Sequence, residues 1–336
     1  MTFERLRKFP RFPLWTEPTP IEPLHNLASE IGSTGFCVKR DDCNGLAFGG
    51  NKVRQMEYYL GDAVAKGADT LLITGAVQSN FVRTAAAACA KAGLQCHIQL
   101  ENRVAKDTHE YNQSGNVFLD KLLGATIHQY PEGEDETGAD ANLETIADGL
   151  RRAGKSPYIV HLHPSHPPLG ALGYIDCAQE FVEQLDAMKQ RPDRIFIPSG
   201  SGNTHGGFLY GLRALGIIDI PVTGVCVRRD AKQQRPRLVE RLEQIADLLE
   251  EDAPTVAEDV ELTDAFLSPG YGISGSAAKE AIQLAARKEA LILDPVYTAK
   301  TFAAAIAYAQ ENPRSKVLVL HTGGGPSIFG YCDDMV

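Results

Sequence analysis

The chain has 336 residues, 43% of them hydrophobic and 23% charged, which suits two domains or one large α/β unit with a substantial core. Its formal net charge of −10 argues against nucleic acid or an anionic membrane as the main partner. No apolar run is long enough to span a membrane and the first ten residues lack a signal-peptide core, so we expect a cytoplasmic protein.

The first half of the chain alternates helices and strands after a proline-rich, extended arm over residues 9–23. Helices are predicted over 24–31, 52–66, 81–92, 112–123 and 142–153, and strands over 36–40, 70–74, 96–100, 126–130 and 158–161. The acidic segment 131–141 between two of these elements is predicted to be a loop. This alternation is typical of a parallel sheet.

A histidine- and proline-rich link over 161–168 separates the two halves, and it is predicted to be a loop because Pro164 disfavours helix before it. Beyond it, helices are predicted over 171–188, 208–215, 237–249, 277–288 and 298–309, strands over 194–198, 221–227 and 316–321, and a solvated loop over 250–261. Glycine-containing turns follow three strands, after Thr74, Pro198 and His321. Ligands bind at the carboxyl ends of strands in open α/β sheets, so one site built from several loops is expected.

Lys52 directly follows Gly49, Gly50 and Asn51 and begins a predicted helix. The positive potential of a helix N-terminus lowers the pKa of an amine, as burial also does. A neutral lysine amine is a nucleophile toward aldehydes, which is Schiff-base chemistry. Taken by itself, the position is more typical of a solvated lysine at the start of a helix, so other motifs must decide.

The segment Ser199–Thr204 is the strongest candidate for a phosphate cradle. Its small residues let successive backbone N–H groups approach one anion, and the following helix adds a favourable potential. It lacks the Gly-Lys-Ser/Thr ending of a P-loop, and His205 stands where a dinucleotide fingerprint has its third glycine. A plain glycine turn is the alternative.

Three further patterns lead to weaker predictions. The segment 270–275 matches G-x-G-x-x-G but follows no clear strand, so its glycines more simply bring Tyr271 close to a ligand. The histidines at 161, 163 and 166 share no helix face and have no carboxylate near them in sequence, so no metal site is predicted. The seven cysteines are scattered without a C-x-x-C pair, which argues against disulfides and a zinc site. The sequence contains no G-x-S-x-G elbow, so nothing in it supports a serine hydrolase.

Five motifs in order, at 49–52, 78–80, 199–204, 295–298 and 321–324, resemble those of the pyridoxal-phosphate (PLP) enzymes of the 1-aminocyclopropane-1-carboxylate (ACC) deaminase / D-cysteine desulfhydrase family, including L-cysteate sulfo-lyase-like members. The resemblance implies a tryptophan-synthase-β-like α/β fold (PLP fold type II) with two open twisted, mainly parallel sheets flanked by helices. It implies a large cofactor-binding domain from 1–51 with 162–336, a smaller domain over 52–161, an active site between them, and a homodimer.

The resemblance also implies roles for individual residues. Lys52 would bind the cofactor covalently, Asn80 its ring hydroxyl, and Tyr271 and Tyr297 would flank the reacting carbons. The phosphate would contact Gly200, Ser201, Gly202, Asn203 and Thr204, and Thr298 or Thr322 would face the pyridine nitrogen. The small amino-acid substrate would meet Asn51, Gln78, Ser79, Asn80, His163 and Ser165, with Ser79 at its carboxylate.

The expected reaction follows from one departure from the deaminases, which carry a glutamate directly after the tyrosine where this chain has Thr298. A hydroxyl leaves the pyridine ring a weaker electron sink than a carboxylate does, so β-elimination is favoured over cyclopropane opening. The leading hypothesis is D-cysteine desulfhydrase, which yields pyruvate, ammonia and sulfide. L-cysteate sulfo-lyase, which yields sulfite, is next, then ACC deaminase or a racemase. Phe81 and the 163–168 link also depart from the family and leave the leaving group and stereochemistry open. A phosphate-ligand binding protein would leave Lys52 and the tyrosines unexplained.

Overall fold

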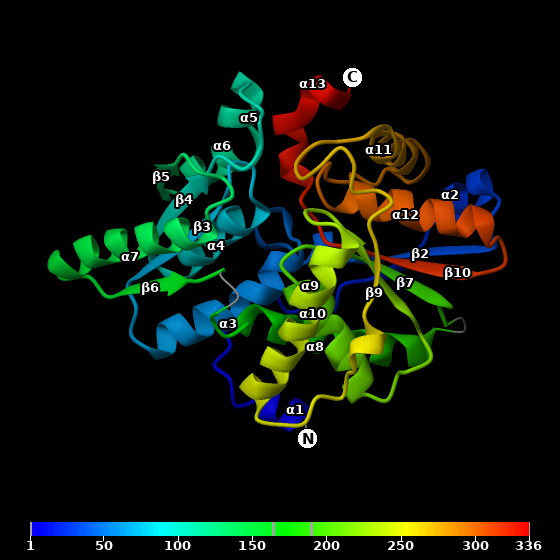
Figure 1. Ribbon diagram of the computed structural model, residues 1–336, viewed down its shortest axis with the longest axis horizontal. Coiled ribbons are helices and arrows are strands. Elements are labelled where there is room, and N and C mark those ends of the chain that lie inside the picture. The colour runs from blue at the N-terminus through cyan, green and yellow to red at the C-terminus, as the bar shows by residue number, and fades with distance from the viewer. Residues whose placement is uncertain (1, 163–164, 189–190, 336) are drawn as a thin grey trace.

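Two sheets organise the chain in the computed structural model, which describes residues 2–162, 165–188 and 191–335 (Figure 1). A six-stranded sheet has the order β1-β2-β10-β7-β8-β9 and a four-stranded sheet the order β5-β4-β3-β6. The strands are β1 (Ile21–Pro23), β2 (Gly35–Arg40), β3 (Thr70–Ala76), β4 (Gln95–Glu101), β5 (Thr126–Tyr130), β6 (Pro157–Val160), β7 (Arg194–Ser199), β8 (Val222–Cys226), β9 (Glu261–Thr263) and β10 (Lys316–His321). All pairs are parallel except β1 with β2.

Helices flank both sheets (Figure 1). They are α1 (Thr2–Leu6), α2 (His25–Ile31), α3 (Asn51–Ala65), α4 (Asn80–Ala92), α5 (His109–Gln113), α6 (Gly115–Leu122), α7 (Glu136–Arg152), α8 (Leu169–Ala187), α9 (Asn203–Ala214), α10 (Ala231–Leu249), α11 (Ser276–Glu289), α12 (Thr298–Glu311) and α13 (Cys332–Met335). Single 3₁₀ turns lie at Asp41–Cys43, Leu46–Phe48, Ala257–Asp259 and Gly325–Tyr331. Among the described residues, none of the helices combines the length and apolar content that crossing a membrane requires.

Alternating side chains of β10 divide the core of the six-stranded sheet into two layers. Leu318 and Leu320 pack in a cluster with α8, α9 and α10, whereas Val317 and Val319 pack in a second cluster with α2, α11 and α12. In the four-stranded sheet, Leu71 and Ile73 likewise pack with α3 and α4, while Leu72 packs with α7. Both sheets are therefore buried on both faces, as parallel sheets require.

Three helices begin five or six residues earlier than the sequence predicts. Helix α7 includes most of the predicted acidic loop, because the Asp135 side chain caps it by accepting a hydrogen bond from the Gly138 N–H at 2.8 Å. Asp230 caps α10 in the same way through the Gln233 N–H at 2.7 Å. Helix α9 includes the glycines that the prediction left in the loop, and a Cβ at Gly207 would collide with the carbonyl of Ala171 in α8. These glycines let two helices approach closely.

Other differences are smaller. The helix predicted over 112–123 divides into α5 and α6 at Ser114, next to Gly115 with φ of +58°. The segment predicted as a loop over 250–261 ends in a 3₁₀ turn and in the first residue of β9. All strands of the four-stranded sheet lie between residues 70 and 160. The division into domains at 51/52 and 161/162 and the homodimer stay predictions.

Candidate active site

The start of α3 is bound to the loop that follows β10. Gly50 has φ of +114°, and a Cβ there would lie 2.9 Å from the carbonyl oxygen of Thr322. The next residue, Asn51, donates its backbone N–H to the same oxygen at 3.0 Å. Only a residue without a side chain fits this turn, and the turn places Lys52 beside the carboxyl end of the six-stranded sheet.

The Lys52 amine lines a cavity between the two sheets. It donates a hydrogen bond to Oε1 of Gln55 at 3.2 Å and lies 4.7 Å from the centre of the Phe81 ring. Burial away from water lowers the pKa of Lys52 to about 8. The neutral, nucleophilic amine is therefore far more populated near neutral pH than on a solvated lysine.

A buried ion network fixes α3 against the large sheet. Arg54 donates to both oxygens of Asp41 at 2.9 and 3.0 Å and to both oxygens of Glu180, in α8, at 2.9 and 3.0 Å. Tyr174 donates its hydroxyl to Asp41, and Lys39 pairs with Glu180. Each charge in the network meets an opposite one, which is the condition for burying ions. The position of Lys52, half a turn from Arg54, follows from this network.

The segment 199–204 passes from the end of β7 into the N-terminus of α9. Gly202 caps this helix with φ of +92°. Thr204 lines the cavity, and its Oγ1 accepts hydrogen bonds from the side-chain amides of Asn51 and Gln55, each at 2.8 Å. With both acceptor positions used, the hydroxyl proton of Thr204 is left to donate to an anion in the cavity. Helix N-terminus, glycines and hydroxyl together form an anion site.

Two polar residues at the start of α4 line the opposite wall. The Ser79 hydroxyl caps the helix by accepting from the N–H groups of Phe81 at 3.2 Å and Val82 at 3.4 Å. Oδ1 of Asn80 accepts from the side chain of Asn116 at 2.8 Å. This bond orients the Asn80 amide, so that its NH₂ group lies beside Gly324, where an added Cβ would be 2.7 Å away.

Two tyrosines complete the site, and their hydroxyl oxygens lie 2.7 Å apart. Burial raises the pKa of Tyr297 well above its ordinary value, so this phenol stays protonated. Tyr297 is positioned by Asp294, whose Oδ2 accepts the backbone N–H groups of Val296 and Tyr297, each at 3.0 Å. Oδ1 of Asp294 accepts both the N–H and the hydroxyl of Thr298 at 2.7 Å.

Comparison with known proteins agrees with this geometry. A family model described as pyridoxal-phosphate dependent enzyme matches residues 13–323. The chain belongs to this family. D-cysteine desulfhydrases of Salmonella typhi and Salmonella choleraesuis (strain SC-B67) are 37% and 38% identical to it over 334 residues, which cover 98% of this chain and 99% of theirs. The chain is thus a member of the ACC deaminase / D-cysteine desulfhydrase family of PLP-dependent enzymes.

Solved structures confirm the predicted tryptophan-synthase-β-like fold. The crystal structure of an ACC deaminase homologue matches with a TM-score of 0.87 at 34% identity and covers 99% of this chain and 98% of that one. An O-ureido-L-serine synthase, with a TM-score of 0.68 at 17% identity, shares the fold alone. Both have this architecture of two mainly parallel sheets.

Most residues predicted for the site of this PLP enzyme do line one cavity. They are Asn51, Lys52, Ser79, Asn80, Gly200, Ser201, Gly202, Thr204, Tyr271, Tyr297 and Thr322. Asn203 is buried but directs its side-chain nitrogen toward Gly170, so only its backbone faces the cradle. The five motifs therefore converge as the resemblance implies.

Besides Asn203, four predicted residues do not line the cavity or cannot be placed. Thr298 is buried, and its hydroxyl is hydrogen-bonded to Asp294. Of the two candidate threonines, Thr322 is the one that lines the cavity. Gln78 donates to the carbonyls of Tyr111 and Ser114 and holds α5 and α6 instead of facing a substrate. Ser165 is exposed. His163 lies outside the described residues.

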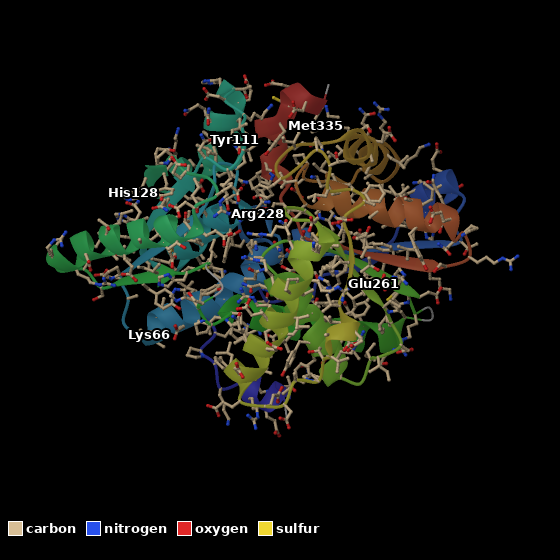
Figure 2. The ribbon with its side chains drawn as sticks, in the orientation of Figure 1. Lys66, Tyr111, His128, Arg228, Glu261 and Met335 are labelled. Carbon is tan, nitrogen blue, oxygen red and sulfur yellow. The ribbon has the colours of Figure 1, made fainter. Side chains whose placement is uncertain are left out.

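The cavity also contains charged residues that the sequence motifs missed. Arg228, Arg229 and Arg237 line it, and all three contact the carboxylate of Glu136 at the start of α7, at 3.1, 2.7 and 3.4 Å. Figure 2 places Arg228 between the two halves of the molecule. These residues come from segments far apart in the sequence and meet only when the two sheets pack together. No local sequence motif therefore marks them. Asp294 directly precedes the motif at 295–298 and could have been found there.

Proposed function

We propose that the protein is a PLP-dependent β-eliminating lyase acting on a small β-substituted amino acid, with D-cysteine as the leading substrate. The observation that carries the proposal is the Lys52 amine, with its lowered pKa, in one cavity with the anion cradle at α9 and the Tyr271–Tyr297 hydroxyl pair. The relatives named D-cysteine desulfhydrase share this chain over nearly its full length.

The residues suit PLP in size and donor chemistry. The cradle N–H groups and the Thr204 hydroxyl would bind its phosphate, Lys52 its aldehyde carbon, and the oriented amide of Asn80 its ring hydroxyl. Thr322 would lie near the ring nitrogen. When bound, PLP supplies an electron sink for negative charge at the substrate α-carbon.

The chain's own groups then supply the proton transfers. Once free, the Lys52 amine can take the proton from the α-carbon, because burial lowers its pKa to about 8 and so raises the fraction of neutral amine. The Ser79 hydroxyl, which accepts two backbone N–H bonds, can donate its proton to the substrate carboxylate. The Tyr271–Tyr297 pair can deliver a proton to the departing sulfur. With D-cysteine and one water, the products are pyruvate, ammonia and hydrogen sulfide.

A second candidate is L-cysteate, which loses sulfite. The observation that favours it is the group of three arginines lining the cavity, since guanidinium groups bind oxyanions through paired N–H donors. ACC deaminase activity is disfavoured because the hydroxyl of Thr322, and not a free carboxylate, lines the cavity there. The carboxylate of Asp294, which also lines the cavity, already accepts four hydrogen bonds.

The test is product identity across substrates. Holoenzyme is given D-cysteine, L-cysteine, L-cysteate or ACC, and pyruvate, 2-oxobutyrate, sulfide and sulfite are identified by mass spectrometry and specific assays. We expect pyruvate with sulfide from D-cysteine and little 2-oxobutyrate from ACC. Lys52→Ala should abolish turnover, whereas Lys66→Ala, on an exposed residue just past the other end of α3, should leave it unchanged. Equal turnover of ACC would refute the lyase proposal, and full activity of Lys52→Ala would refute the site.

A further inference from the structure

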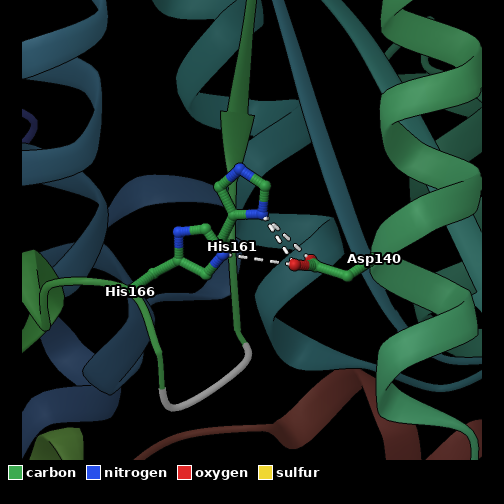
Figure 3. A group of neighbouring side chains, drawn as sticks. All are labelled: Asp140, His161 and His166. Atoms are coloured by element: carbon green, nitrogen blue, oxygen red, sulfur yellow. Dashed lines mark hydrogen bonds and ion pairs between the residues drawn. The ribbon is translucent and has the colours of Figure 1, made fainter.

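Two histidines and one aspartate from separate segments form a cluster beside the cavity (Figure 3). Asp140 lies in the first turns of α7, His161 directly follows β6, and His166 lies in the link to α8. Their candidate ligand atoms all lie within 4.8 Å of one another. We propose that Asp140, His161 and His166 bind a divalent transition-metal cation of the zinc or nickel type.

The distances in the cluster suit a shared ion. Nδ1 of His161 lies 3.0 Å from the Asp140 carboxylate, and Nε2 of His166 lies 3.3 Å from it. Two ligands at about 2.0–2.1 Å from one tetrahedral ion are themselves roughly 3.3–3.4 Å apart. The two ring nitrogens lie within 4.8 Å of each other. The two imidazole rings stack in parallel, with centroids 3.8 Å apart and 4° between their planes, so one ring must turn for both nitrogens to point at a shared ion.

The charges around His161 favour a bound cation over hydrogen bonds alone among Asp140, His161 and His166. Nδ1 of its ring faces Asp140, and Nε2 faces a second carboxylate, Glu144, at 3.7 Å. A neutral imidazole has one N–H and can satisfy only one of these carboxylates. A metal on Nδ1 leaves the Nε2 proton for Glu144, which is the usual outer partner of a metal-bound histidine.

Glu144 is itself held in place, because its other oxygen pairs with Arg151 at 3.4 Å, about two turns further along α7. Asp140 and Glu144 are one helical turn apart, so both carboxylates point to the same side of α7. The cluster therefore has a carboxylate ligand, two imidazole ligands and an oriented outer carboxylate. Mixed imidazole and carboxylate ligands are typical of zinc and nickel sites, and water would complete the coordination.

The location gives the ion a structural consequence. It would join α7, which packs on the four-stranded sheet, to the link that leads into α8 of the other half. Asp140 also lines the active cavity. Binding a dication would offset the negative charge of Asp140 on this wall.

Titration of the holoenzyme with ZnCl₂ and with NiCl₂, followed by calorimetry, tests the proposal. Cys43 and Cys332 are changed to serine in every protein of the series, so that exposed thiolates do not bind the metal. We expect one saturable site per chain that disappears in His161→Ala and in Asp140→Asn. His166→Ala, at the most exposed position of the three, serves if either of these fails to fold.

A second histidine pair provides the matched control. His97 and His128 stack with centroids 5.2 Å apart and ring nitrogens 3.0 Å apart. His97→Ala with His128→Ala removes two imidazoles and should leave the site intact. Glu144→Gln keeps the shape of the side chain that faces Nε2 of His161 but removes its charge. This substitution should lower the affinity for the metal by about tenfold.

Metal binding that is unchanged in His161→Ala, or that is lost in the His97/His128 variant, would overturn the proposal. So would the absence of saturable binding in the parent protein. Differential scanning calorimetry gives an independent readout, because a ligand of the folded state raises the melting temperature with its concentration. That rise should be seen with the parent and be absent from His161→Ala.

Discussion

The Lys52 amine faces a cavity wall and not open water, and this burial lowers its pKa to about 8 from an ordinary value of 10.5. The lowered pKa has a kinetic consequence, because only the neutral amine attacks the cofactor's aldehyde. The neutral fraction rises about tenfold for each pH unit below the pKa.

We therefore expect the rate at which apoprotein binds PLP covalently to rise by about tenfold per unit between pH 6 and pH 7, and to level off above about pH 8. Stopped-flow absorbance of the visible band, with borohydride trapping and peptide mapping of Lys52, measures this. A profile that continues to rise toward pH 10 would mean that Lys52 is solvated. Lys66→Ala should follow the parent profile.

Gly202, in the proposed phosphate cradle, is the second position where one substitution should decide cofactor binding. Gly202→Asp would place a carboxylate beside a bound phosphate, and like-charge juxtaposition in a desolvated site costs several kcal/mol. We expect PLP occupancy to collapse while the circular dichroism spectrum is retained. Gly216 is the control, since it also has positive φ, at +77°, but has no atom within 4 Å of an added Cβ. If Gly202→Asp retains PLP and Gly216→Asp loses it, the phosphate lies elsewhere.

For single residues, the sequence predicted best those that lie in short motifs at strand-to-helix turns. Lys52, Ser79 and Gly202 lie at turns into helices, where glycines and small polar residues are typical of a ligand-binding site. The sequence does not decide between Thr298 and Thr322 as the residue facing the pyridine nitrogen, and in the structure the Thr298 hydroxyl is bonded to Asp294. Which of two threonines faces a cavity depends on side-chain partners that a linear pattern does not contain.

Helix α7, which packs on the four-stranded sheet, places a carboxylate at the cavity. Its first residue, Glu136, pairs with Arg228, Arg229 and Arg237, and these arginines hold the pKa of Glu136 below its ordinary value despite the cost of burial. The stability that this carboxylate contributes is present above its unfolded-state pKa and is lost as the pH falls through the lowered one.

Glu136→Gln should leave the three arginines without their counter-charge, so we expect sulfate to inhibit this variant more strongly than the parent. Inhibition constants at fixed ionic strength measure the change. Glu134→Gln is the control, because Glu134 is 77% exposed and, among the residues that the structure describes, forms an ion pair with Arg228 alone. Equal sulfate inhibition in all three proteins would mean that the arginines do not form an anion site.

The start of α7 also shows why element boundaries were predicted less well than elements. The acidic run around Asp135 is typical of a solvated loop, yet one of its carboxylates caps the helix. In α9, Gly206 and Gly207 lower helix propensity, and the helix forms because Gly207 packs against α8. Capping and packing depend on partners that local composition does not reveal.

Across the whole molecule, one buried acid should make stability depend on pH. Both oxygens of Asp120, in α6, are buried without a hydrogen-bond partner among the described residues, and burial raises the pKa of Asp120 to about 8. The unfolded state ionises near its ordinary value of 3.8. Stability is therefore fully present below that value and is lost as the pH rises toward 8.

Asp120→Asn removes this ionisation, so its free energy of unfolding relative to the parent should increase by about 1.4 kcal/mol per pH unit between pH 5 and pH 7. Urea unfolding of both proteins across this range provides the measurement. The slope is the test, because the absolute difference also contains the cost of burying an amide. A pH-independent difference would show that Asp120 is ionised in the folded protein.

The fold as a whole could be predicted from alternating elements and five ordered motifs, whereas the walls of the cavity could not. Glu136, Asp140 and Arg228 lie in segments without a motif and meet only after two sheets pack together. The histidines of the link were set aside for want of a nearby carboxylate, and Asp140 supplies one from 21 residues away. Sequence distance is a poor guide to such neighbours.

The order of strands in the large sheet bears on how the protein is made. Strand β10 lies between β2 and β7, so the sheet stays open at its centre until residue 321 has been synthesised. The small sheet is complete at residue 160, roughly 10–30 s earlier at ordinary rates of translation. Lys52 is thus on the nascent chain well before Thr322 closes the turn against Gly50. In the proposed site, a growing chain that has not reached Thr322 cannot complete the cofactor pocket, so we expect PLP to bind only after both sheets have formed.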